Sequence, residues 1–151
     1  MTGAQSIAIG EGVYKVVNQN SGLALDAYAA GTTNGSVVDQ WGYSGTANDQ
    51  WLLSGGDNGV YQVSNMNSGL LLDVNGGSGA VDQWGSTGTS NQSWFIMPNL
   101  DGTYSIVNQK TGTLLQVLGK STANGAQLGL LSGLTLGQTP PSNAEWTLGA
   151  P

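Results

Sequence analysis

Two short stretches of the chain contain the same three side chains, which together could recognise a neutral, hydroxyl-rich ligand. Each holds an aspartate, a tryptophan two residues later and an asparagine further on: Asp39, Trp41 and Asn48, then Asp82, Trp84 and Asn91. Carboxylate oxygens accept hydrogen bonds from hydroxyl groups, and an asparagine amide both donates and accepts. The face of an indole adds apolar contact with the C–H side of a sugar ring. The combination predicts a shallow sugar-binding pocket.

A second aspartate stands ahead of each stretch, at the end of an apolar segment. These residues, Asp26 and Asp73, are included among the predicted sugar-binding residues, although an aspartate there could also cap a turn by bonding its own backbone. In a β-strand, side chains two residues apart point to the same face. Asp39 and Trp41 are therefore expected to project together into the pocket, while Gln40 points the other way.

The two stretches belong to a repeat that occurs three times, over residues 12–54, 59–97 and 102–148. A tyrosine near the start and a tryptophan near the end mark each copy: Tyr14, Tyr61 and Tyr104, and Trp51, Trp94 and Trp146. We expect these six aromatic residues to be structural. Tyr28 and Tyr43 occur in the first copy alone; they could widen its pocket, but ordinary surface positions are expected.

The pattern within each copy predicts short strands and no helix. In the first copy, segments 13–18, 23–27, 37–41 and 51–53 are bounded by Gly, Asn, Ser or Thr, which favour turns. Four strands in each of three copies give about twelve, which suits a single all-β domain over residues 1–151, a β-trefoil with pseudo-three-fold symmetry. A propeller of similar repeats generally needs at least four blades, so three copies favour the trefoil.

The third copy departs from the other two at the predicted pocket. Gln116 replaces the aspartate and Gly129 stands where the tryptophan is expected, while Gln127 and Asn143 remain as polar side chains. We therefore expect absent or very weak binding in this copy. Its extra length lies in residues 130–142, whose two consecutive prolines predict a loop.

Composition excludes several classes of function. The 151 residues include no cysteine and no histidine, which removes disulfides, thiolate nucleophiles and the commonest general base and metal ligand. The net charge of −6, with three cationic side chains, disfavours nucleic acid and anionic membranes, since both bind basic surfaces. The acidic residues are scattered rather than spaced as calcium ligands. We therefore predict no metal, no cofactor, no nucleic-acid partner and no membrane insertion.

Targeting signals are not evident in the sequence. Residues 1–11 hold no basic region followed by an apolar run, so no secretory signal is predicted. No apolar stretch approaches the roughly 20 residues that cross a bilayer. These features fit a cytoplasmic protein and, equally, a module of a larger secreted one.

The order Tyr-x-(Val/Ile), Asn-x-x-(Ser/Thr)-Gly, Leu-Asp and Asn-x-x-Trp resembles the ricin-type β-trefoil lectin family over nearly the whole chain. The resemblance implies that Asp26 and Asp73 grip sugar hydroxyls, that the paired tryptophans stack on the ring and that the paired asparagines bind hydroxyls. It adds Gln92, which opens the one intact Gln-x-Trp element. Many members carry glutamine where this chain has Asp39 and Asp82. Galactose and N-acetylgalactosamine, the family's usual ligands, are the expected sugars.

Two other functions are compatible with parts of the pattern. Asp26 and Asp39 could be cast as the acid and base of a glycosidase, but the pair recurs as Asp73 and Asp82, and duplication within so short a repeat argues against catalysis. A protein-binding or protease-inhibitor trefoil would act through its loops, which need no repeated pockets. We therefore predict a multivalent lectin, not an enzyme, that binds terminal sugars of glycans through the first two copies and agglutinates.

Overall fold

The computed structural model describes residues 9–134 and 138–151. Two sequence predictions concern residues outside these ranges: part of the segment tested for a secretory signal, and the middle of the third-copy loop. Within the described ranges, no helix is long and apolar enough to cross a membrane.

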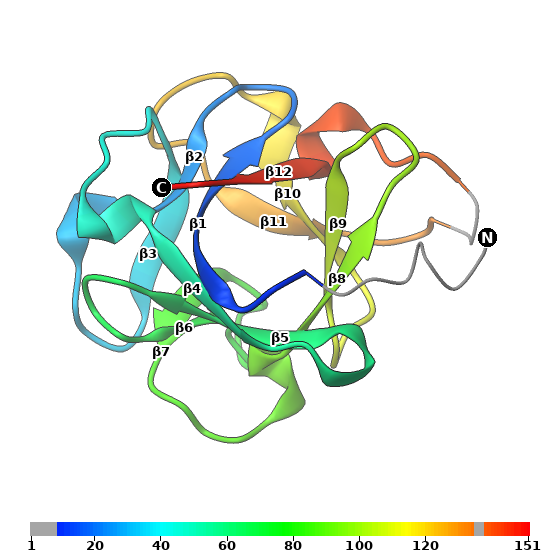
Figure 1. Ribbon diagram of the computed structural model, residues 1–151. Coiled ribbons are helices and arrows are strands. Elements are labelled where there is room, and N and C mark those ends of the chain that lie inside the picture. The colour runs from blue at the N-terminus through cyan, green and yellow to red at the C-terminus, as the bar shows by residue number, and fades with distance from the viewer. Residues whose placement is uncertain (1–8, 135–137) are drawn as a thin grey trace.

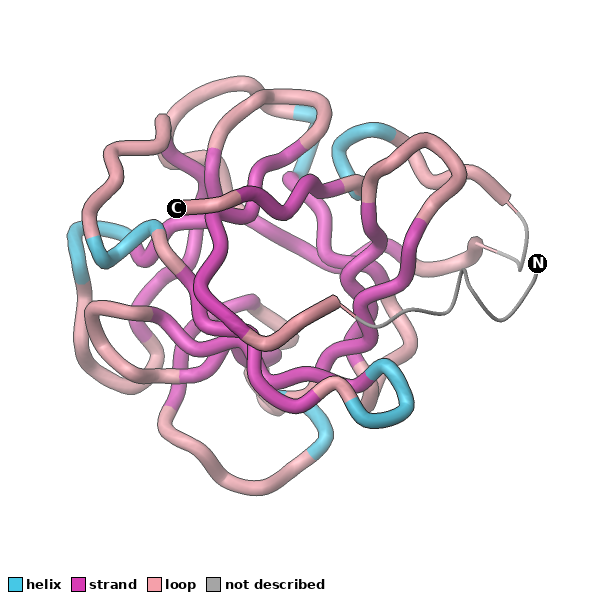
Figure 2. Tube along the Cα trace, viewed as in Figure 1, coloured by secondary structure: helices cyan, strands magenta, loops and turns pink. Residues whose placement is uncertain are grey.

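The described residues form short strands joined by turns and single-turn 3-10 helices (Figure 2), which confirms the all-β prediction and the expected number of strands. The twelve strands in this part of the chain are β1 Gly12–Asn18, β2 Ala24–Ala27, β3 Ser36–Trp41, β4 Trp51–Gly55, β5 Val60–Asn65, β6 Leu71–Val74, β7 Val81–Trp84, β8 Trp94–Pro98, β9 Tyr104–Asn108, β10 Leu114–Val117, β11 Leu128–Leu131 and β12 Trp146–Gly149. The 3-10 helices are η2 Tyr28–Ala30, η3 Ala47–Asp49, η4 Asp57–Gly59, η5 Ser90–Gln92, η6 Leu118–Lys120 and η7 Ser142–Ala144.

The first and last strands of the three copies close into a six-stranded antiparallel ring. β1 pairs with β4, β4 with β5, β5 with β8, β8 with β9, β9 with β12, and β12 returns to β1. The middle strands form three hairpins, β2–β3, β6–β7 and β10–β11, and each hairpin joins the ring through its own copy. In Figure 1 the ring strands surround the centre of the molecule, with the β2–β3 and β6–β7 hairpins to the left and lower left, while β10 and β11 are seen within its outline. Each copy of the repeat therefore contributes the same two ring strands and one hairpin.

The closing tryptophans form the centre of the core, as predicted. Trp51, Trp94 and Trp146 are fully buried. Each indole N–H donates at 2.9–3.0 Å to the carbonyl oxygen of a leucine on the second strand of its own copy: Leu25, Leu72 and Leu115. The residue after each leucine is Asp26, Asp73 or Gln116. The core indole thus fixes the backbone immediately before the residue that each copy presents at its predicted pocket.

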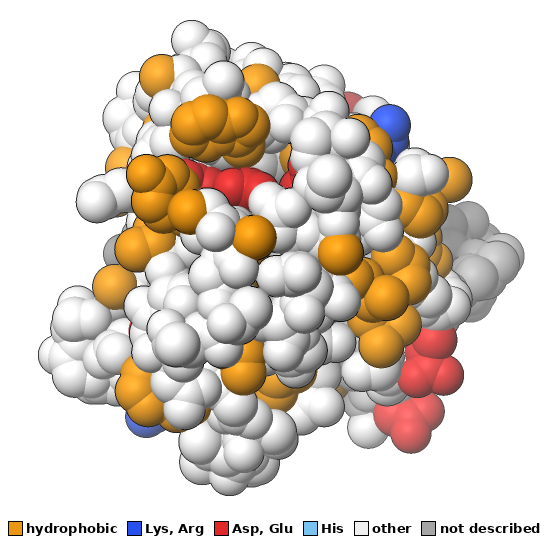
Figure 3. Space-filling view, turned by 90° about the vertical axis from the view of Figure 1, so that its left-hand side faces the viewer, with side chains coloured by type: hydrophobic (Ala, Val, Ile, Leu, Met, Phe, Trp, Pro, Cys, Tyr) orange, Lys and Arg blue, Asp and Glu red, His pale blue; other side chains and the backbone are white. Residues whose placement is uncertain are grey.

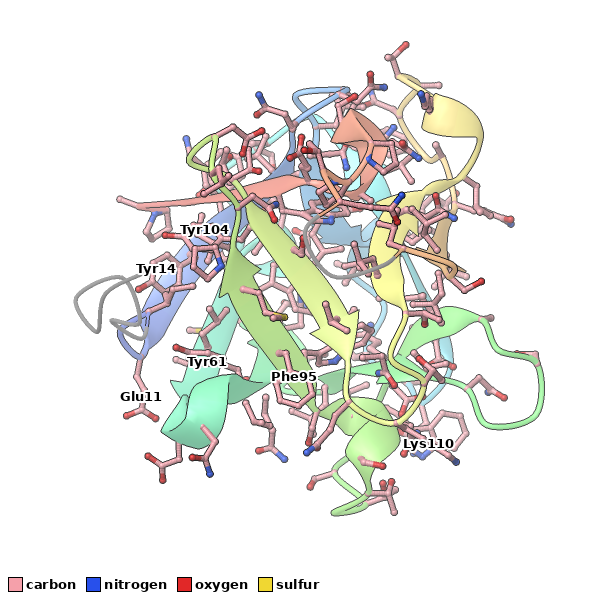
Figure 4. All side chains as sticks on the ribbon, turned by 90° about the vertical axis from the view of Figure 1, so that its right-hand side faces the viewer. Glu11, Tyr14, Tyr61, Phe95, Tyr104 and Lys110 are labelled. Atoms are coloured by element: carbon pink, nitrogen blue, oxygen red, sulfur yellow. The ribbon has the colours of Figure 1, made fainter. Side chains whose placement is uncertain are left out.

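The three equivalent tyrosines gather at one end of the ring, near the start of the described chain (Figure 4). Tyr61 is buried and its hydroxyl donates to the carbonyl of Ile9 at 2.7 Å. Tyr14 donates in the same way to Gly10 at 2.7 Å, and Tyr104 packs against the core. Their structural role is confirmed.

One boundary in the third copy differs from the prediction. The loop expected over residues 130–142 begins two residues later, because β11 continues to Leu131. Leu130 and Leu131 pair with Leu115 and Leu114 across the β10–β11 hairpin. Pairing with the neighbouring strand therefore extends β11 into a segment that the prolines further along had suggested was irregular.

Candidate functional site

The first cavity, called site one, lies at the end of the β2–β3 hairpin. It has a volume of about 350 Å³ and is lined by Asp26, Tyr28, Ala29, Trp41, Ser44 and Asn48. Figure 3 views the side of the molecule that carries β2 and β3 and shows acidic side-chain atoms in a slot between hydrophobic side chains. The structure therefore brings together three predicted residues that are up to 22 positions apart in the chain.

The second cavity, called site two, has the same position on the β6–β7 hairpin. Its volume is about 380 Å³ and its lining consists of Asp73, Asn75, Gly76, Trp84, Thr87, Thr89 and Asn91. The aspartate, tryptophan and asparagine again come from the hairpin and from the 3-10 helix that precedes the last strand of the copy. The sequence repeat has thus produced the same group of side chains twice.

The asparagine amide has a defined orientation in both sites. In site one, Asn48 Nδ2 donates to Asp26 Oδ1 at 2.8 Å, while the hydroxyl of Thr46 donates to Asn48 Oδ1 at 2.6 Å. In site two, Asn91 Nδ2 donates to Asp73 Oδ1 at 2.9 Å, and the hydroxyl of a threonine donates to the amide oxygen in the same way. The amide nitrogen therefore faces the carboxylate, which orients one carboxylate oxygen and partly neutralises it.

A buried asparagine from the next copy donates a hydrogen bond to the backbone of each pocket asparagine. Asn65 Nδ2 donates to the carbonyl of Asn48 at 2.9 Å, and Asn108 Nδ2 donates to that of Asn91 at 3.1 Å. Both donors are at most 1 % exposed. Because a buried amide without a partner is costly, these bonds tie the position of each pocket asparagine to the start of the following copy.

The tryptophan of each site rests on the hairpin loop of another copy. A side-chain carbon placed at Gly125 would lie 3.4 Å from the Trp41 ring, and one at Gly35 would lie 3.4 Å from the Trp84 ring. Both glycines have positive φ, 85° and 86°, a conformation that favours glycine. The indole in each site therefore packs directly on a turn that only a residue without a side chain forms easily.

The asparagine before each of these glycines continues the same contact. Asn124 Oδ1 accepts from the backbone N–H of Gly42 at 2.9 Å, and Asn34 Oδ1 accepts from that of Gly85 at 2.8 Å. Gly42 and Gly85 directly follow the two site tryptophans. Each site thus combines its own copy's polar side chains with a supporting loop from the copy before it in the ring.

The remaining predicted residues lie behind the cavities. Asp39 and Asp82 are buried, 1 % and 5 % exposed, and line neither cavity. Gln92 is 1 % exposed; its Oε1 accepts from the backbone of Thr87 at 2.8 Å and its Nε2 donates to Gly85 at 2.9 Å. This corrects the expectation that these three side chains reach the pocket surface: Asp39 and Asp82 are buried behind the aspartates opposite them, and the turn over residues 85–87 binds the Gln92 amide.

The buried aspartates lie directly opposite the pocket aspartates. Asp26 pairs with Asp39 across the β2–β3 hairpin, and Asp73 pairs with Asp82 across β6–β7. Burial, a side-chain hydrogen bond with Asp26 and repulsion by its charge raise the pKa of Asp39 to about 8. Burial and a hydrogen bond with Asp73 raise the pKa of Asp82 to about 7. Burial also raises the pKa of Asp26.

Tyr28, expected as an ordinary surface residue, lines site one. Its side chain is 51 % exposed, and its ring centre lies 6.5 Å from that of Trp41 with an angle of 51° between the planes. The sequence favoured the surface interpretation over a widened pocket, because the position follows β2 in η2, where the other copies hold no aromatic residue. Its occurrence beside the pocket aspartate was the available signal.

The third copy closes the equivalent position with an aliphatic side chain. Leu118, on η6, lies against Gly129, where a side-chain carbon would come within 2.4 Å of it. Asn143 is buried and donates to Gln116 Oε1 at 3.2 Å and to the carbonyl of Val117 at 2.9 Å. This position has neither carboxylate nor indole, so the expectation of weak or absent binding there remains a prediction with a structural basis.

Comparison with known proteins places the fold. A designed three-fold symmetric protein, ThreeFoil, is 34 % identical, with a TM-score of 0.85 over 91 % of this chain and 98 % of that protein. An exo-β-1,3-galactanase from Clostridium thermocellum is 33 % identical, with a TM-score of 0.81, but this chain spans 30 % of its length. A ricin B-like lectin from Macrolepiota procera, solved with lactose, is 17 % identical with a TM-score of 0.77 over 96 % of this chain and 99 % of that one, which supports the fold alone.

No match was found among curated proteins. The family described as ricin-type β-trefoil lectin domain-like matches residues 5–80 and 47–131. These two overlapping matches cover most of the chain and include both cavities. The repeated strand pairing, the buried tryptophans and this match agree: the chain belongs to the ricin-type β-trefoil lectin domain-like family.

Proposed function

We propose that this protein is a non-enzymatic lectin that binds the terminal sugars of glycans through site one and site two. The observation that carries the proposal is the double occurrence of one arrangement: a carboxylate, an amide that bonds to it and a partly exposed indole around a cavity. Structural necessity does not explain the repetition, because the third copy keeps the same strands without the carboxylate and the indole.

The chemistry of each cavity suits a pyranose. Volumes of about 350 and 380 Å³ lie at the small end of the range for ligand pockets, so each holds the end of a glycan rather than a long segment. In site one the Asp26 carboxylate accepts hydrogen bonds from adjacent hydroxyls, and the Trp41 ring packs on the C–H face of the sugar. Trp41 is 41 % exposed and therefore accessible for such stacking.

Galactose and N-acetylgalactosamine are the proposed sugars. Their axial 4-hydroxyl leaves a continuous C–H face on the opposite side of the ring, which matches a flat indole. Proteins with the same fold include an exo-β-1,3-galactanase and lectins solved with lactose or with N-acetylgalactosamine. The two lectins are under 25 % identical and share only the fold, so the galactose-type ligand is proposed from the chemistry of the cavities and from the family resemblance.

The acidic pairs do not suit glycoside hydrolysis. The two carboxyl groups of a glycosidase stand about 5 to 9.5 Å apart, on either side of the bond they break. Asp26 and Asp39 instead share a side-chain hydrogen bond, and only Asp26 lines the cavity. A ligand in site one therefore meets one carboxylate, which can bind a hydroxyl but lacks a second group placed for catalysis.

Two weak sites on one molecule would act together. A millimolar dissociation constant corresponds to only about −4 kcal/mol, and shallow polar cavities of this kind are expected near that value. Engagement of a second sugar on the same surface becomes intramolecular and raises the overall affinity. Sites on different hairpins could also bridge two glycan-bearing surfaces, so the protein is expected to agglutinate.

A glycan array followed by calorimetric titration with lactose tests the proposal. The native protein should bind galactose-terminated glycans with two sites, and the double variant Asp26→Ala, Asp73→Ala should bind none. Gln116→Ala, at the equivalent place in the third copy, is the matched control and should retain both sites. Absence of sugar binding by the native protein would refute the lectin and favour recognition of a protein through the loops. Equal binding by the double variant would place the site elsewhere.

A further inference from the structure

Each proposed sugar site is backed by a buried pair of carboxyl groups. Asp26 faces Asp39, and Asp73 faces Asp82, in the same register of two equivalent hairpins. All four side chains are at most 5 % exposed. Only one member of each pair lines its cavity. The second aspartate of each pair therefore has no direct route to a ligand, and its presence needs another explanation.

The members of a pair differ in the hydrogen-bond donors that reach them. Asn48 and Asn91 donate to the cavity-facing aspartates at 2.8 and 2.9 Å. In contrast, Oδ1 of Asp39 and Oδ1 of Asp82 are buried without a hydrogen-bond partner in the structure, and the contact of Asp82 Oδ2 with Asn75 is long, 3.4 Å. We call Asp26 and Asp73 the front carboxyl groups and Asp39 and Asp82 the rear ones. Amide donors stabilise negative charge on each front carboxylate, while burial without a donor favours the neutral form of each rear group.

Among the described residues, no cation contributes to the pKa of Asp39 or Asp82. The titratable group that faces Asp39 is Asp26, on β2. The titratable residue of η2 is Tyr28. The charge of Asp49, on η3, raises the pKa of Asp26. β7, which also pairs with β3, carries Asp82, and β11 carries no titratable side chain. Asp82 in turn faces the carboxyl group opposite it on β6. Two buried carboxyl groups in hydrogen-bond contact do not both ionise, so one proton remains between them.

We propose that Asp39 and Asp82 are protonated positioning residues, each donating a hydrogen bond to the carboxylate in front of it and turning one oxygen of that carboxylate toward the sugar. The proposal rests on the proposed lectin function, because it assigns a regulator to the same two sites. The amide and the rear carboxyl group then hold the front carboxylate from two sides. Loss of the shared proton would replace a hydrogen bond with repulsion between two buried charges and would disorder the acceptor that the sugar needs.

The arrangement makes sugar binding sensitive to alkaline pH, with a different threshold at each site. The rear group of site two loses its proton near pH 7 and that of site one near pH 8. If binding requires the proton, affinity falls about tenfold for each pH unit above the threshold. At pH 8 and above, site one should therefore be the tighter of the two by up to about tenfold.

Single-site proteins make the test direct. Trp84→Ala leaves site one and Trp41→Ala leaves site two, and lactose affinity of each is measured by titration from pH 5 to 9.5. The expected result is a decline beginning near pH 8 for site one and near pH 7 for site two. Tryptophan fluorescence and circular dichroism at each pH check that the fold persists, so that a loss of binding is assigned to the site.

Substitution of the rear residue then separates its proton from its packing. In the site-one protein, Asp39→Asn keeps a donor and cannot ionise, so binding should no longer decline above pH 8. Asp39→Leu removes the donor and should weaken binding at every pH, with the asparagine variant restoring it. Asp82→Asn and Asp82→Leu repeat the comparison in site two.

The failures are distinguishable. Absence of lactose binding at every pH would overturn the proposed galactose-type sites themselves. Binding that stays constant to pH 9.5, or that declines alike in the native and asparagine proteins, would overturn the role of the shared proton while leaving the lectin intact.

Discussion

Site one and site two share an aspartate, a tryptophan and an asparagine but differ at the rim. Tyr28 and Ala29 border site one, whereas Asn75 and Gly76 occupy the corresponding border of site two. Site one therefore offers two aromatic rings inclined at 51° to one another. Site two offers one ring and an additional amide. A ligand with apolar surface on two sides should prefer site one.

The pocket asparagines also differ in the number of amide N–H groups that remain free to donate to a ligand. In site two, Asn91 Nδ2 donates both to Asp73 and to the carbonyl of Val74, at 2.9 and 3.1 Å. In site one, Asn48 Nδ2 donates to Asp26 alone among the described residues. One amide N–H of Asn48 thus remains for a sugar hydroxyl. The comparison teaches that the fold repeats the three central side chains, while the turn after the second strand differs and is expected to set the relative strength of the two proposed sites.

Removal of the indoles should have the largest effect. Trp41→Ala should weaken sugar binding at site one, and Trp84→Ala at site two, below detection. The dissociation constant should rise tenfold or more, about 1.4 kcal/mol or more, because each ring supplies the main apolar contact with the sugar. The fold should survive, since Trp41 is 41 % exposed. Calorimetric titration with lactose should report one site instead of two, and agglutination should disappear in either variant. A variant that unfolds instead would show that its ring belongs to the core.

The buried carboxyl pairs should make the two hairpins respond differently to pH in the absence of sugar. An unfolded aspartate loses its proton near pH 4, whereas folded Asp39 keeps it to about pH 8 and folded Asp82 to about pH 7. The folded state binds more protons over that range, so the free energy of unfolding falls as pH rises from 4 through these values and then levels. Urea unfolding at successive pH values measures this.

The paired variants separate the contributions of the two hairpins. Asp39→Asn should reduce the loss of stability between pH 4 and 8, and Asp82→Asn should reduce it between pH 4 and 7. Between pH 7 and 8 only the Asp39 substitution should matter. Identical profiles for both variants would contradict different protonation in the two sites.

The second aromatic ring of site one should have a moderate effect. Tyr28→Ala should weaken lactose binding at site one about three- to fivefold, because a pair of aromatic contacts contributes about 0.5–1.5 kcal/mol, and should leave site two unchanged. Tyr43→Ala is the matched control, since Tyr43 contacts Lys15 and Gln50 outside the cavity. An equal effect of the two substitutions would remove Tyr28 from the site and with it the main difference between the cavities.

The sequence predicted the repeat, the strands and the three central residues of each site, because these follow from local spacing. The sequence did not predict how deeply each side chain is buried. Asp39 and Trp41 were both expected in the pocket, yet the first is buried and the second exposed, because Gln127, more than 80 residues away, pairs with the strand at Asp39. For the third copy, the sequence showed Gly129 in place of the tryptophan but not that Leu118 lies over it, because the pairing of β10 with β11 and the turn of η6 bring the two together.

The loops that support the tryptophans offer the finest test, because they act across copies. Asn34 lies in the first copy but bonds behind Trp84, and Asn124 lies in the third copy but bonds behind Trp41. In the second copy the corresponding turn folds back on itself, with Gly79 donating to Asn75 at 2.8 Å. The third copy, which follows it, has Gly129 in place of a site tryptophan, so that turn has no indole to support.

Asn34→Ala should therefore weaken site two about two- to threefold and spare site one, while Asn124→Ala should do the reverse. Each change removes one neutral hydrogen bond, about 0.5–1.5 kcal/mol, from behind an indole rather than from the sugar itself. Ser78→Ala, in the second-copy turn, should change neither site. Titration of the single-site proteins resolves the two effects. If Asn34→Ala weakened site one instead, each site would depend on its own copy, and the pairing of a loop with the next copy's tryptophan would have no functional meaning.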